Sequence, residues 1–573
     1  LAPESLRFET TAHALAMAGA GVYWPGRQAG FLFAAEPETF LGVTGLGFRY
    51  DRERGQGIFF LSLPAWKDRE PTYLGEAGGV ALSFCLSLFD CASCRDFFRG
   101  VNHLRLLLHP EESPRPVLPF SHAAALIEES LNTHHWLDPY YLSAIGLENL
   151  RQGPRPATDA FPQEWYLQEG KSGGSALAYA LTRSPSEATR NRGWGMLEFI
   201  ARQGVSPSGL FFSLVGRWGP LYGAPWTHVR PALDACFYML RAAGERGEEE
   251  GEILRRAAGQ SLDALVEIFR RHGEFGRAVS REKGAELLEP GTAAGGLAIA
   301  CLVLGHRLFR RKTYLETAKE AARVYAGILS RGSAGGCDPL AGPALPDSAS
   351  LTALLESFMS LYEETQEDAC LEGALAAAEA FASYVMARSI ALPPDSDLAR
   401  AGIATRGAVL TGGGAARLGP GPWSTSLGAL LRLYRVTGEE WLLSLLSDVA
   451  LALPQYVATF HARVGDLRRG MAASEIPLLP EGTRLPYSVE PVSRLGTAQA
   501  ILLMRAELPG VYVDPPREAL AVFDHVNASV DFEAMRLYLS NPTPYRAQGR
   551  IEVEVGTRLA YDLAPGESAD WPF

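Results

Sequence analysis

The period of the hydrophobic pattern changes twice along the chain. Residues 1 to about 115 carry aromatic and branched stretches broken by Gly and Pro, such as FLGVTGLGFRY and GVALSFCLSLFD, which are typical of β-strands. From about 116 to 510, helical spacing takes over between Gly- and Pro-rich loops. Alternation returns near the end, as in AMRLYLSNPTPYRAQGRIEVEV. We therefore expect an N-terminal β-sandwich (1–115), a helical domain (116–510) and a small C-terminal β-strand domain (511–573), in a mainly α chain.

The helical region repeats itself. Segment 360–381 aligns with 432–453, and 304–325 is a looser third copy. In each repeat an apolar helix that opens with small residues precedes an amphipathic one. The apolar helices are expected at 170–181, 229–240, 289–304, 346–358, 422–434 and 493–504. The amphipathic helices are expected near 118–132, 187–203, 250–272, 314–330, 370–388 and 440–458. The array begins with an outer helix and ends with an inner one, so six pairs can close into a ring.

Composition and charge limit the partners, the cellular location and the cofactors that we expect. The net charge of −12 argues against nucleic acid or an anionic membrane as the main partner. No uninterrupted apolar run of about 18 residues appears, and no basic segment precedes Leu1, so we expect neither a spanning helix nor a signal peptide. The seven cysteines lie mostly in apolar runs, which favours reduced, buried thiols and a cytoplasmic location. Cys91 and Cys94 form a lone CxxC with no second pair, so we expect no metal and no cofactor.

Two sets of motifs carry a family resemblance. GGCDPLAGPALPDSAS occurs with LLESFMSLYEET, and ELPGVYV occurs with VFDHV. With the paired-helix array, they resemble a bacterial set of glycoside-hydrolase-like proteins in the six-hairpin glycosidase superfamily, the (α/α)6 toroid. The resemblance covers about 116–510, and the β-sandwich fits it as well. This chain departs from that set at Ala349, where relatives carry an acidic residue, and at GGGAA (412–416), where they carry polar ones. Both departures put its catalytic competence in doubt.

The resemblance predicts a site where the N-termini of the inner helices meet at one mouth of the ring. Glycoside cleavage usually needs two carboxylates there, and we take Asp347, Asp234 and Glu289 as the catalytic candidates. Each also has a structural explanation. Asp347 precedes a helix and can cap it. Asp234 lies inside an apolar helix, four residues after Arg230, and can pair with it. Glu289 precedes Pro-Gly and can be an ordinary loop carboxylate.

The same loops supply candidate substrate-binding residues. They are Trp226, His228, Arg230, Trp423, Glu169, Lys171 and Arg494. Tryptophan rings would stack on sugars, and the basic side chains would suit an acidic sugar. The structural alternatives are a Glu169–Lys171 salt bridge, a hydrogen-bonded loop histidine, and core packing for the tryptophans.

Three functions remain open at this point. The first is a glycoside hydrolase that acts on an oligo- or polysaccharide with two carboxylates. The second is a polysaccharide lyase with His228, Tyr222 and Arg230 at its centre. The third is a catalytically silent carbohydrate-binding or assembly subunit, in a homo-oligomer or beside a paralogous partner. A separation of roughly 5–10 Å between the Asp347 and Asp234 carboxylates in an open pocket would favour hydrolysis. Burial of Asp234 against Arg230 would favour the third function.

Overall fold

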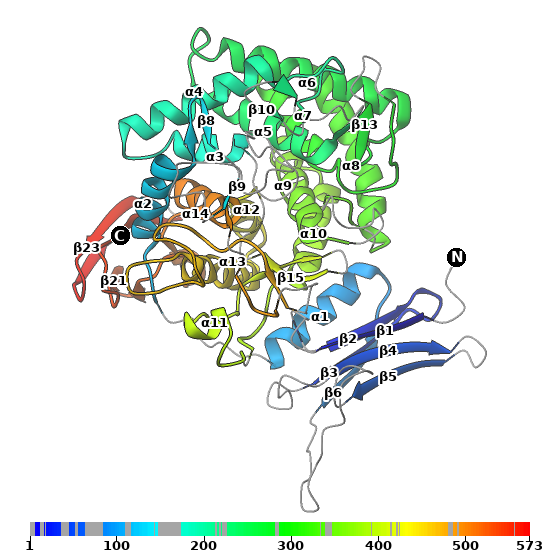
Figure 1. Ribbon diagram of the computed structural model, residues 1–573. Coiled ribbons are helices and arrows are strands. Elements are labelled where there is room, and N and C mark those ends of the chain that lie inside the picture. Colours follow the sequence, from blue (N-terminus) through cyan, green and yellow to red (C-terminus); the bar gives the residue numbers. More distant parts are fainter. Residues whose placement is uncertain are drawn as a thin grey trace, which may run out of the picture.

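The computed structural model describes most of the chain (Figure 1). The described residues are 6–11, 17, 19–35, 45–51, 56–62, 84–108, 116–141, 144–146, 174–212, 215–216, 219–220, 226–280, 286–332, 334–337, 346–390, 392–412, 415–419, 422, 424–478, 485–489, 492–554 and 556–573.

The N-terminal region contains two three-stranded antiparallel sheets, with strand orders β1-β4-β5 and β2-β3-β6. The strands are β1 (Leu6–Thr11), β2 (Gly19–Trp24), β3 (Ala29–Ala35), β4 (Gly45–Asp51), β5 (Gln56–Ser62) and β6 (Phe84–Asp90). Aromatic rings connect the sheets, because the centroid of Phe59 lies 5.1 Å from that of Phe31 and 6.1 Å from that of Phe33. The strands agree with the expected β-rich region, and the full β-sandwich stays a prediction.

One element of this region differs from the expectation. Residues 94–108, expected within the β-rich region, form helix α1 (Cys94–Leu108). The helix begins with a capping arrangement. Asp96 N–H donates to Ser93 Oγ (3.1 Å), and Ser93 N–H donates back to the Asp96 carboxylate (3.0 Å). At the other end of α1, Arg105 forms a buried ion pair with Asp448 in the helical region, at 3.0 Å, so α1 anchors the N-terminal sheets to the ring.

The helical region contains the expected pairs. The inner helices are α3 (Gly174–Leu181), α5 (Val229–Glu245), α7 (Ala298–Phe309), α9 (Ser348–Thr365), α12 (Gly428–Thr437) and α14 (Gly496–Glu507). The outer helices are α2 (Phe120–Ser130), α4 (Glu187–Gln203), α6 (Glu252–His272), α8 (Lys312–Ser330), α10 (Asp368–Ala382) and α13 (Glu440–Ala452). Each inner helix packs against an outer one, and the inner helices follow one another in the order α14, α3, α5, α7, α9, α12. A mainly α fold is therefore confirmed, with the paired arrangement predicted from the repeats.

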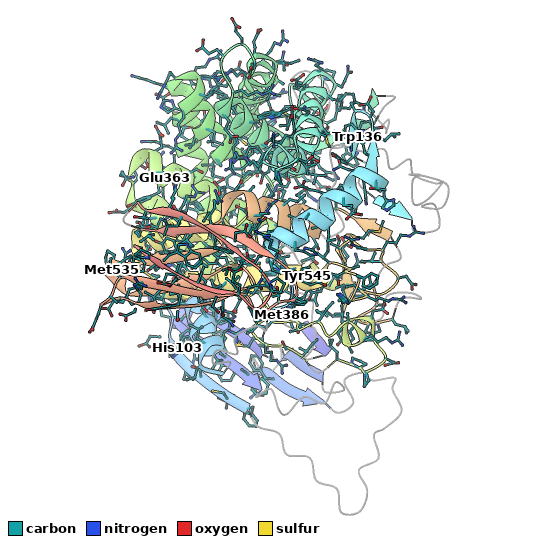
Figure 2. All side chains as sticks on the ribbon, turned by 90° about the vertical axis from the view of Figure 1, so that its left-hand side faces the viewer. His103, Trp136, Glu363, Met386, Met535 and Tyr545 are labelled. Atoms are coloured by element: carbon teal, nitrogen blue, oxygen red, sulfur yellow. The ribbon has the colours of Figure 1, made fainter. Side chains whose placement is uncertain are left out.

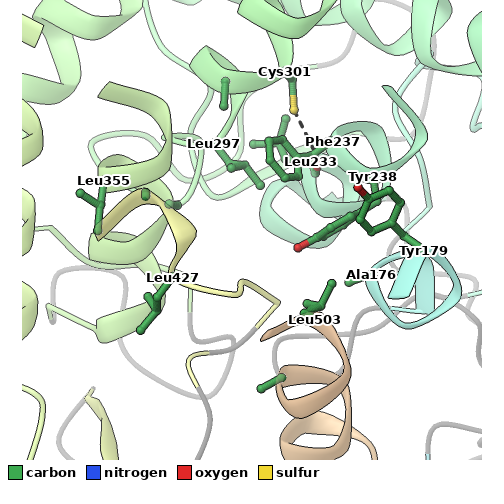
Figure 3. Packing of buried hydrophobic residues seen from close by; sticks show 14 of the residues in the cluster. Ala176, Tyr179, Leu233, Phe237, Tyr238, Leu297, Cys301, Leu355, Leu427 and Leu503 are labelled. Atoms are coloured by element: carbon green, nitrogen blue, oxygen red, sulfur yellow. Dashed lines mark hydrogen bonds between the residues drawn. The ribbon is translucent and has the colours of Figure 1, made fainter. Parts of the chain in front are cut away.

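Side chains fill the centre of the ring. Tyr179 of α3, Tyr238 of α5, Leu297 before α7, Leu355 of α9 and Leu503 of α14 belong to one buried cluster, and Figure 3 shows them distributed around the inner helices. Two inner helices begin six or more residues later than expected, because the small-residue openings before α7 and α12 form turns and extended lead-ins rather than helix. Residues 170–173, before α3, lie outside the described part.

Two long connections form a lobe beside the ring. They run from α10 to α12 and from α13 to α14, and they hold α11 (Asp397–Arg400), β14 (Val409–Gly412), β15 (Ala415–Gly419), β16 (Ile476–Pro477) and β17 (Val492–Arg494). Their apolar side chains form a small core of their own. At the glycine-rich segment, β14 ends at Gly412 and β15 begins at Ala415, and the two strands pair antiparallel.

The C-terminal region forms a second β unit on the flank of the ring. Its sheets have the orders β19-β18-β22-β23 and β20-β21-β24. The strands are β18 (Val511–Asp514), β19 (Ala519–Val522), β20 (Asn527–Asp531), β21 (Arg536–Ser540), β22 (Ala547–Val553), β23 (Arg558–Leu563) and β24 (Ser568–Pro572). Figure 2 shows these strands, with Met535 and Tyr545, lying across the side of the helical body.

The Asp524-His525 step of the VFDHV motif attaches this unit to the ring. His525 Nδ1 accepts from the N–H groups of Val117 (2.5 Å) and Leu118 (3.0 Å), and Nε2 lies 3.0 Å from the carbonyl oxygen of Leu451. Asp524 Oδ1 accepts from Phe120 N–H at the start of α2 (2.8 Å). The motif therefore fixes the first outer helix, the end of α13 and the C-terminal sheet together.

Candidate functional site

The predicted mouth lies where the inner helices begin. Arg230, in the first turn of α5, donates to the carbonyl oxygen of Ala349 in the first turn of α9 at 2.6 Å. These two helices therefore start at the same end of the ring. The rim above them includes β12 (Trp226–His228), which pairs with β13 (Ala278–Ser280).

Asp347 caps α9 and also holds the loop before it. Its Oδ1 accepts from Ser350 N–H at 2.7 Å, and its Oδ2 accepts from the N–H groups of Gly336 and Cys337, each at 2.9 Å. The residue is 0% exposed. Its extended backbone, with φ −142° and ψ 153°, is that of an N-cap. The carboxylate thus stabilises two turns of backbone that would otherwise leave buried N–H groups without partners.

Gly412 explains part of the glycine-rich segment. Its backbone bridges to Asp347, and its φ is +97°. A Cβ added there would lie 2.8 Å from Asp347 Cα and 2.8 Å from the Pro346 carbonyl oxygen. Only glycine allows both this conformation and this approach, so the segment supports the turn that orients Asp347.

Asp234 and Arg230 form a buried ion pair. Arg230 Nε lies 3.1 Å from Asp234 Oδ1, and Asp234 is 3% exposed. Burial raises the pKa of the Asp234 carboxyl, while the Arg230 charge opposes that shift. Burial alone would lower the pKa of Arg230, but Asp234 raises it on balance, so the guanidinium stays protonated. The helical i, i+4 spacing that predicted this pair holds in the structure.

Arg230 links this pair to the rest of the mouth. Besides Ala349, its guanidinium reaches Cys337 Sγ (3.4 Å) and Ser424 Oγ (3.4 Å). Burial, which outweighs the effect of Arg230, raises the pKa of the Cys337 thiol to about 12, so the thiol is neutral near pH 7. Ala349 packs with Cys337 and Ala294 in a small apolar cluster. Ala349 is therefore a buried alanine beside a neutral thiol.

Sequence reasoning missed the role of Ser424. Its side chain contacts Arg230, and its carbonyl oxygen accepts from Tyr238 O–H at 2.7 Å. Ser424 precedes α12, which stands opposite α5 in the order of inner helices. These contacts therefore cross the ring. The run Ser-Thr-Ser in PWSTSLG was the available signal, but its spacing does not specify a partner on α5.

The rim carries accessible candidates. Trp226 is 37% exposed, and its ring meets His228 edge-on with centroids 4.7 Å apart. The Glu289 side chain is 45% exposed, and its Oε2 accepts from Arg277 Nη1 at 2.9 Å. Arg277 N–H donates to the Glu289 carbonyl oxygen, and Val229 N–H donates to that of Arg277. Trp226, His228 and Glu289 are thus held by one small network of strands beside the start of α5.

The remaining predicted residues are only partly placed. Glu169, Lys171 and Trp423 lie outside the described residues. The backbone of Arg494 ends β17 and pairs with Ala144 of β9 (Ala144–Gly146), but its side chain is not among those described. The roles of these residues stay predictions.

Several buried polar side chains near the inner-helix starts find no hydrogen-bond partner among the described residues. They are Ser175 at the start of α3, Thr292 before α7 and Gln499 in the first turn of α14. Buried polar groups are usually paired. Like Asp234 and Asp347, these side chains are buried beneath the mouth and do not line its surface. Among the described residues, no group of three or more His, Cys, Asp or Glu side chains could hold a metal ion.

Comparison with known proteins gives distant structural similarity alone. No known family profile and no curated protein matches the sequence. The chain is similar to a polysaccharide lyase, with 10% identity over 84% of this chain and 63% of the lyase and a TM-score of 0.43. It is similar to a D-mannose isomerase, with 12% identity over 67% of this chain and 96% of the isomerase and a TM-score of 0.44. It is also similar to an unsaturated glucuronyl hydrolase specific for heparin, with 11% identity over 68% of this chain and 95% of the hydrolase and a TM-score of 0.42. The chain spans less than two thirds of the lyase. None of these activities is transferred to it. No helix among the described residues is long and apolar enough to cross a membrane.

Proposed function

We propose that this chain binds a carbohydrate at the mouth of its helical ring, and that Asp234 and Asp347 shape the mouth rather than act as acid and base. One observation carries the second part. Both carboxylates are buried, and both direct their oxygens to protein donors, Arg230 for one and three backbone N–H groups for the other. A general acid must reach the glycosidic oxygen directly or through one water.

Two features of the rim support a carbohydrate as the ligand. The exposed ring of Trp226 offers an apolar face for a sugar, and His228 packs against it. The half-exposed carboxylate of Glu289 lies in the same strand network and can accept hydrogen bonds from sugar hydroxyls. The family resemblance of the sequence points to the same class of ligand.

A binding and turnover experiment on the full chain tests the proposal. Oligosaccharides with and without uronic acid units are titrated by calorimetry, and the same samples are assayed for reducing ends and for absorbance of an unsaturated product. We expect binding without turnover, and Trp226→Ala should weaken binding about tenfold through the lost stacking area. Trp571→Ala, on the C-terminal β24, is the matched control and should bind normally. If Trp226→Ala binds every oligosaccharide as the wild type does, the mouth is not the binding site.

Glu289 gives the hydrolase a specific alternative. It is a half-exposed carboxylate at the rim, held by Arg277. If reducing ends appear without an absorbing unsaturated product, and Glu289→Gln abolishes them while binding persists, the chain is a hydrolase that uses Glu289. If Asp234→Asn abolishes turnover in a variant that keeps its fold, our assignment of Asp234 to a structural role fails. A rise in absorbance that accompanies the new reducing ends would indicate the lyase, because elimination releases a reducing end together with the unsaturated sugar.

A further inference from the structure

A second cleft lies at the opposite end of the inner helices from the mouth. It has a volume of about 400 Å³ and is bounded by α2, the end of α3, the end of α14 and the C-terminal strands β22 and β23. Three arginines line it: Arg183 just after α3, Arg505 in the last turn of α14, and Arg550 in β22. They come from two parts of the chain that meet only in the folded protein.

The arginines are held in place without being fully neutralised. Arg550 Nη2 donates to the carbonyl oxygens of Ala506 (3.1 Å) and Leu508 (2.9 Å), which position its guanidinium against the end of α14. Neither acceptor carries a charge. Arg505 Nη1 lies 3.8 Å from Glu128 Oε1, which is beyond hydrogen-bond distance. The Arg505 charge also opposes the burial-induced rise in the pKa of Glu128 and of Asp524.

The nearby carboxylates are largely engaged elsewhere. Glu128 accepts a hydrogen bond from Ser184 O–H, and burial raises its pKa. Asp524 accepts from Phe120 N–H (2.8 Å) and from Tyr561 O–H, and burial raises its pKa as well. Arg183 contacts the Glu245 carboxylate, so its charge is the best balanced of the three.

The positive charges of the arginines also interact with one another. Burial lowers the pKa of Arg550. Glu552 opposes that shift, and the charges of Arg558, Arg183 and Arg505 add to it. The chain as a whole is acidic, with a net charge of −12, so its overall composition does not explain why three guanidinium groups line one cleft. A bound anion would relieve the repulsion among them, and guanidinium groups present paired N–H donors that match an oxyanion.

We propose that this cleft binds a small molecule through an oxyanion, meaning a phosphate, sulfate or carboxylate group. Its volume is in the range of pockets for small molecules. Phe120 and Leu502 line the apolar part, which leaves room for a body attached to the anionic group. The ligand would contact both α14 and β22 and would therefore tie the ring to the C-terminal sheet.

Calorimetric titration of the full chain with four probes tests the proposal: inorganic phosphate, sulfate, glucuronate and glucose 6-phosphate, at constant ionic strength. Arg505→Gln should weaken binding about tenfold or more, because it removes one of the three positive charges that line the cleft. Arg550→Lys keeps the charge but loses the paired donors, so it should weaken binding by a smaller factor. Arg558→Gln is the matched control, because Arg558 is 82% exposed on β23 and outside the cleft.

The outcomes separate the sources of the anion. Equal affinity for inorganic and sugar-borne anions supports a free oxyanion site, whereas tighter binding of glucuronate or glucose 6-phosphate supports an anionic sugar derivative. The proposal is overturned if no probe binds below about 10 mM, or if Arg558→Gln weakens binding as much as Arg505→Gln. Circular dichroism checks that each variant is folded, and Arg550→Lys provides a second test if Arg505→Gln is not.

Discussion

The buried histidine of the VFDHV motif makes a quantitative prediction about acid stability. Burial lowers the pKa of His525 to about 4 from its ordinary value of 6.5. Its Nδ1 accepts from Val117 and Leu118, and its Nε2 faces the Leu451 carbonyl oxygen. The neutral ring, with its proton on Nε2, satisfies all three contacts. Protonation of Nδ1 would place a donor against two N–H groups.

The sign follows from linkage. As the pH falls below 6.5, the unfolded chain binds a proton at this histidine before the folded chain does, so acid favours unfolding until the pH reaches about 4. The full loss is about 3 kcal/mol, and about 2 kcal/mol is already lost between pH 8 and pH 5. Asp524, whose pKa is raised by burial, acts in the opposite direction, because the folded chain then binds its proton before the unfolded chain does. Asp524 is unchanged in the wild type and in the His525→Gln variant that are compared below.

The perturbation is His525→Gln, which retains a hydrogen-bond acceptor and a donor but cannot be protonated. Urea unfolding followed by tryptophan fluorescence at pH 8 and pH 5 gives the loss of stability for each protein. The wild type should lose about 2 kcal/mol more than the variant over this interval. His103→Gln, at an exposed position of α1 (Figure 2), should behave as the wild type. Parallel losses in wild type and His525→Gln would refute the reasoning.

Two further predictions concern buried geometry. Gly407→Ala should cost at least about 4 kcal/mol of stability or prevent folding, because a Cβ there would lie 1.9 Å from the Asp448 carbonyl oxygen. Gly402→Ala is the control: its φ is also positive but the space around it is open, so it should cost about 1 kcal/mol. Similar melting temperatures for the two variants would contradict this. Arg230→Met should destabilise the chain by about 3–5 kcal/mol by leaving Asp234 unpaired, and adding Asp234→Leu should recover at least half of that loss in thermal unfolding. A double variant less stable than Arg230→Met would show that the pair is not the cause.

The hydrophobic periodicity predicted the paired helices well, because in every pair the inner helix is apolar and the outer helix is amphipathic. It missed α1, because the stretch that contains DFFRGVNHLRLLL follows strands of similar composition. Local rules also anticipated two contacts of the mouth, the cap at Asp347 and the i, i+4 pair of Arg230 and Asp234. Contacts between distant segments were beyond reach. Nothing near Ser424 in the sequence indicates that it contacts α5, and nothing near Gly412 indicates that it contacts Asp347. Likewise, Arg183, Arg505 and Arg550 are distant in the sequence and line the same cleft only in the folded chain.

The segment that crosses the ring has a topological consequence. Ser424 is buried, and its carbonyl oxygen accepts from Tyr238 O–H of α5, so this segment lies across the axis of the ring among the described residues. Under the proposed function, we therefore expect a polymer to present an end or a side branch at the mouth, and we expect the ligand to leave by the opening through which it entered.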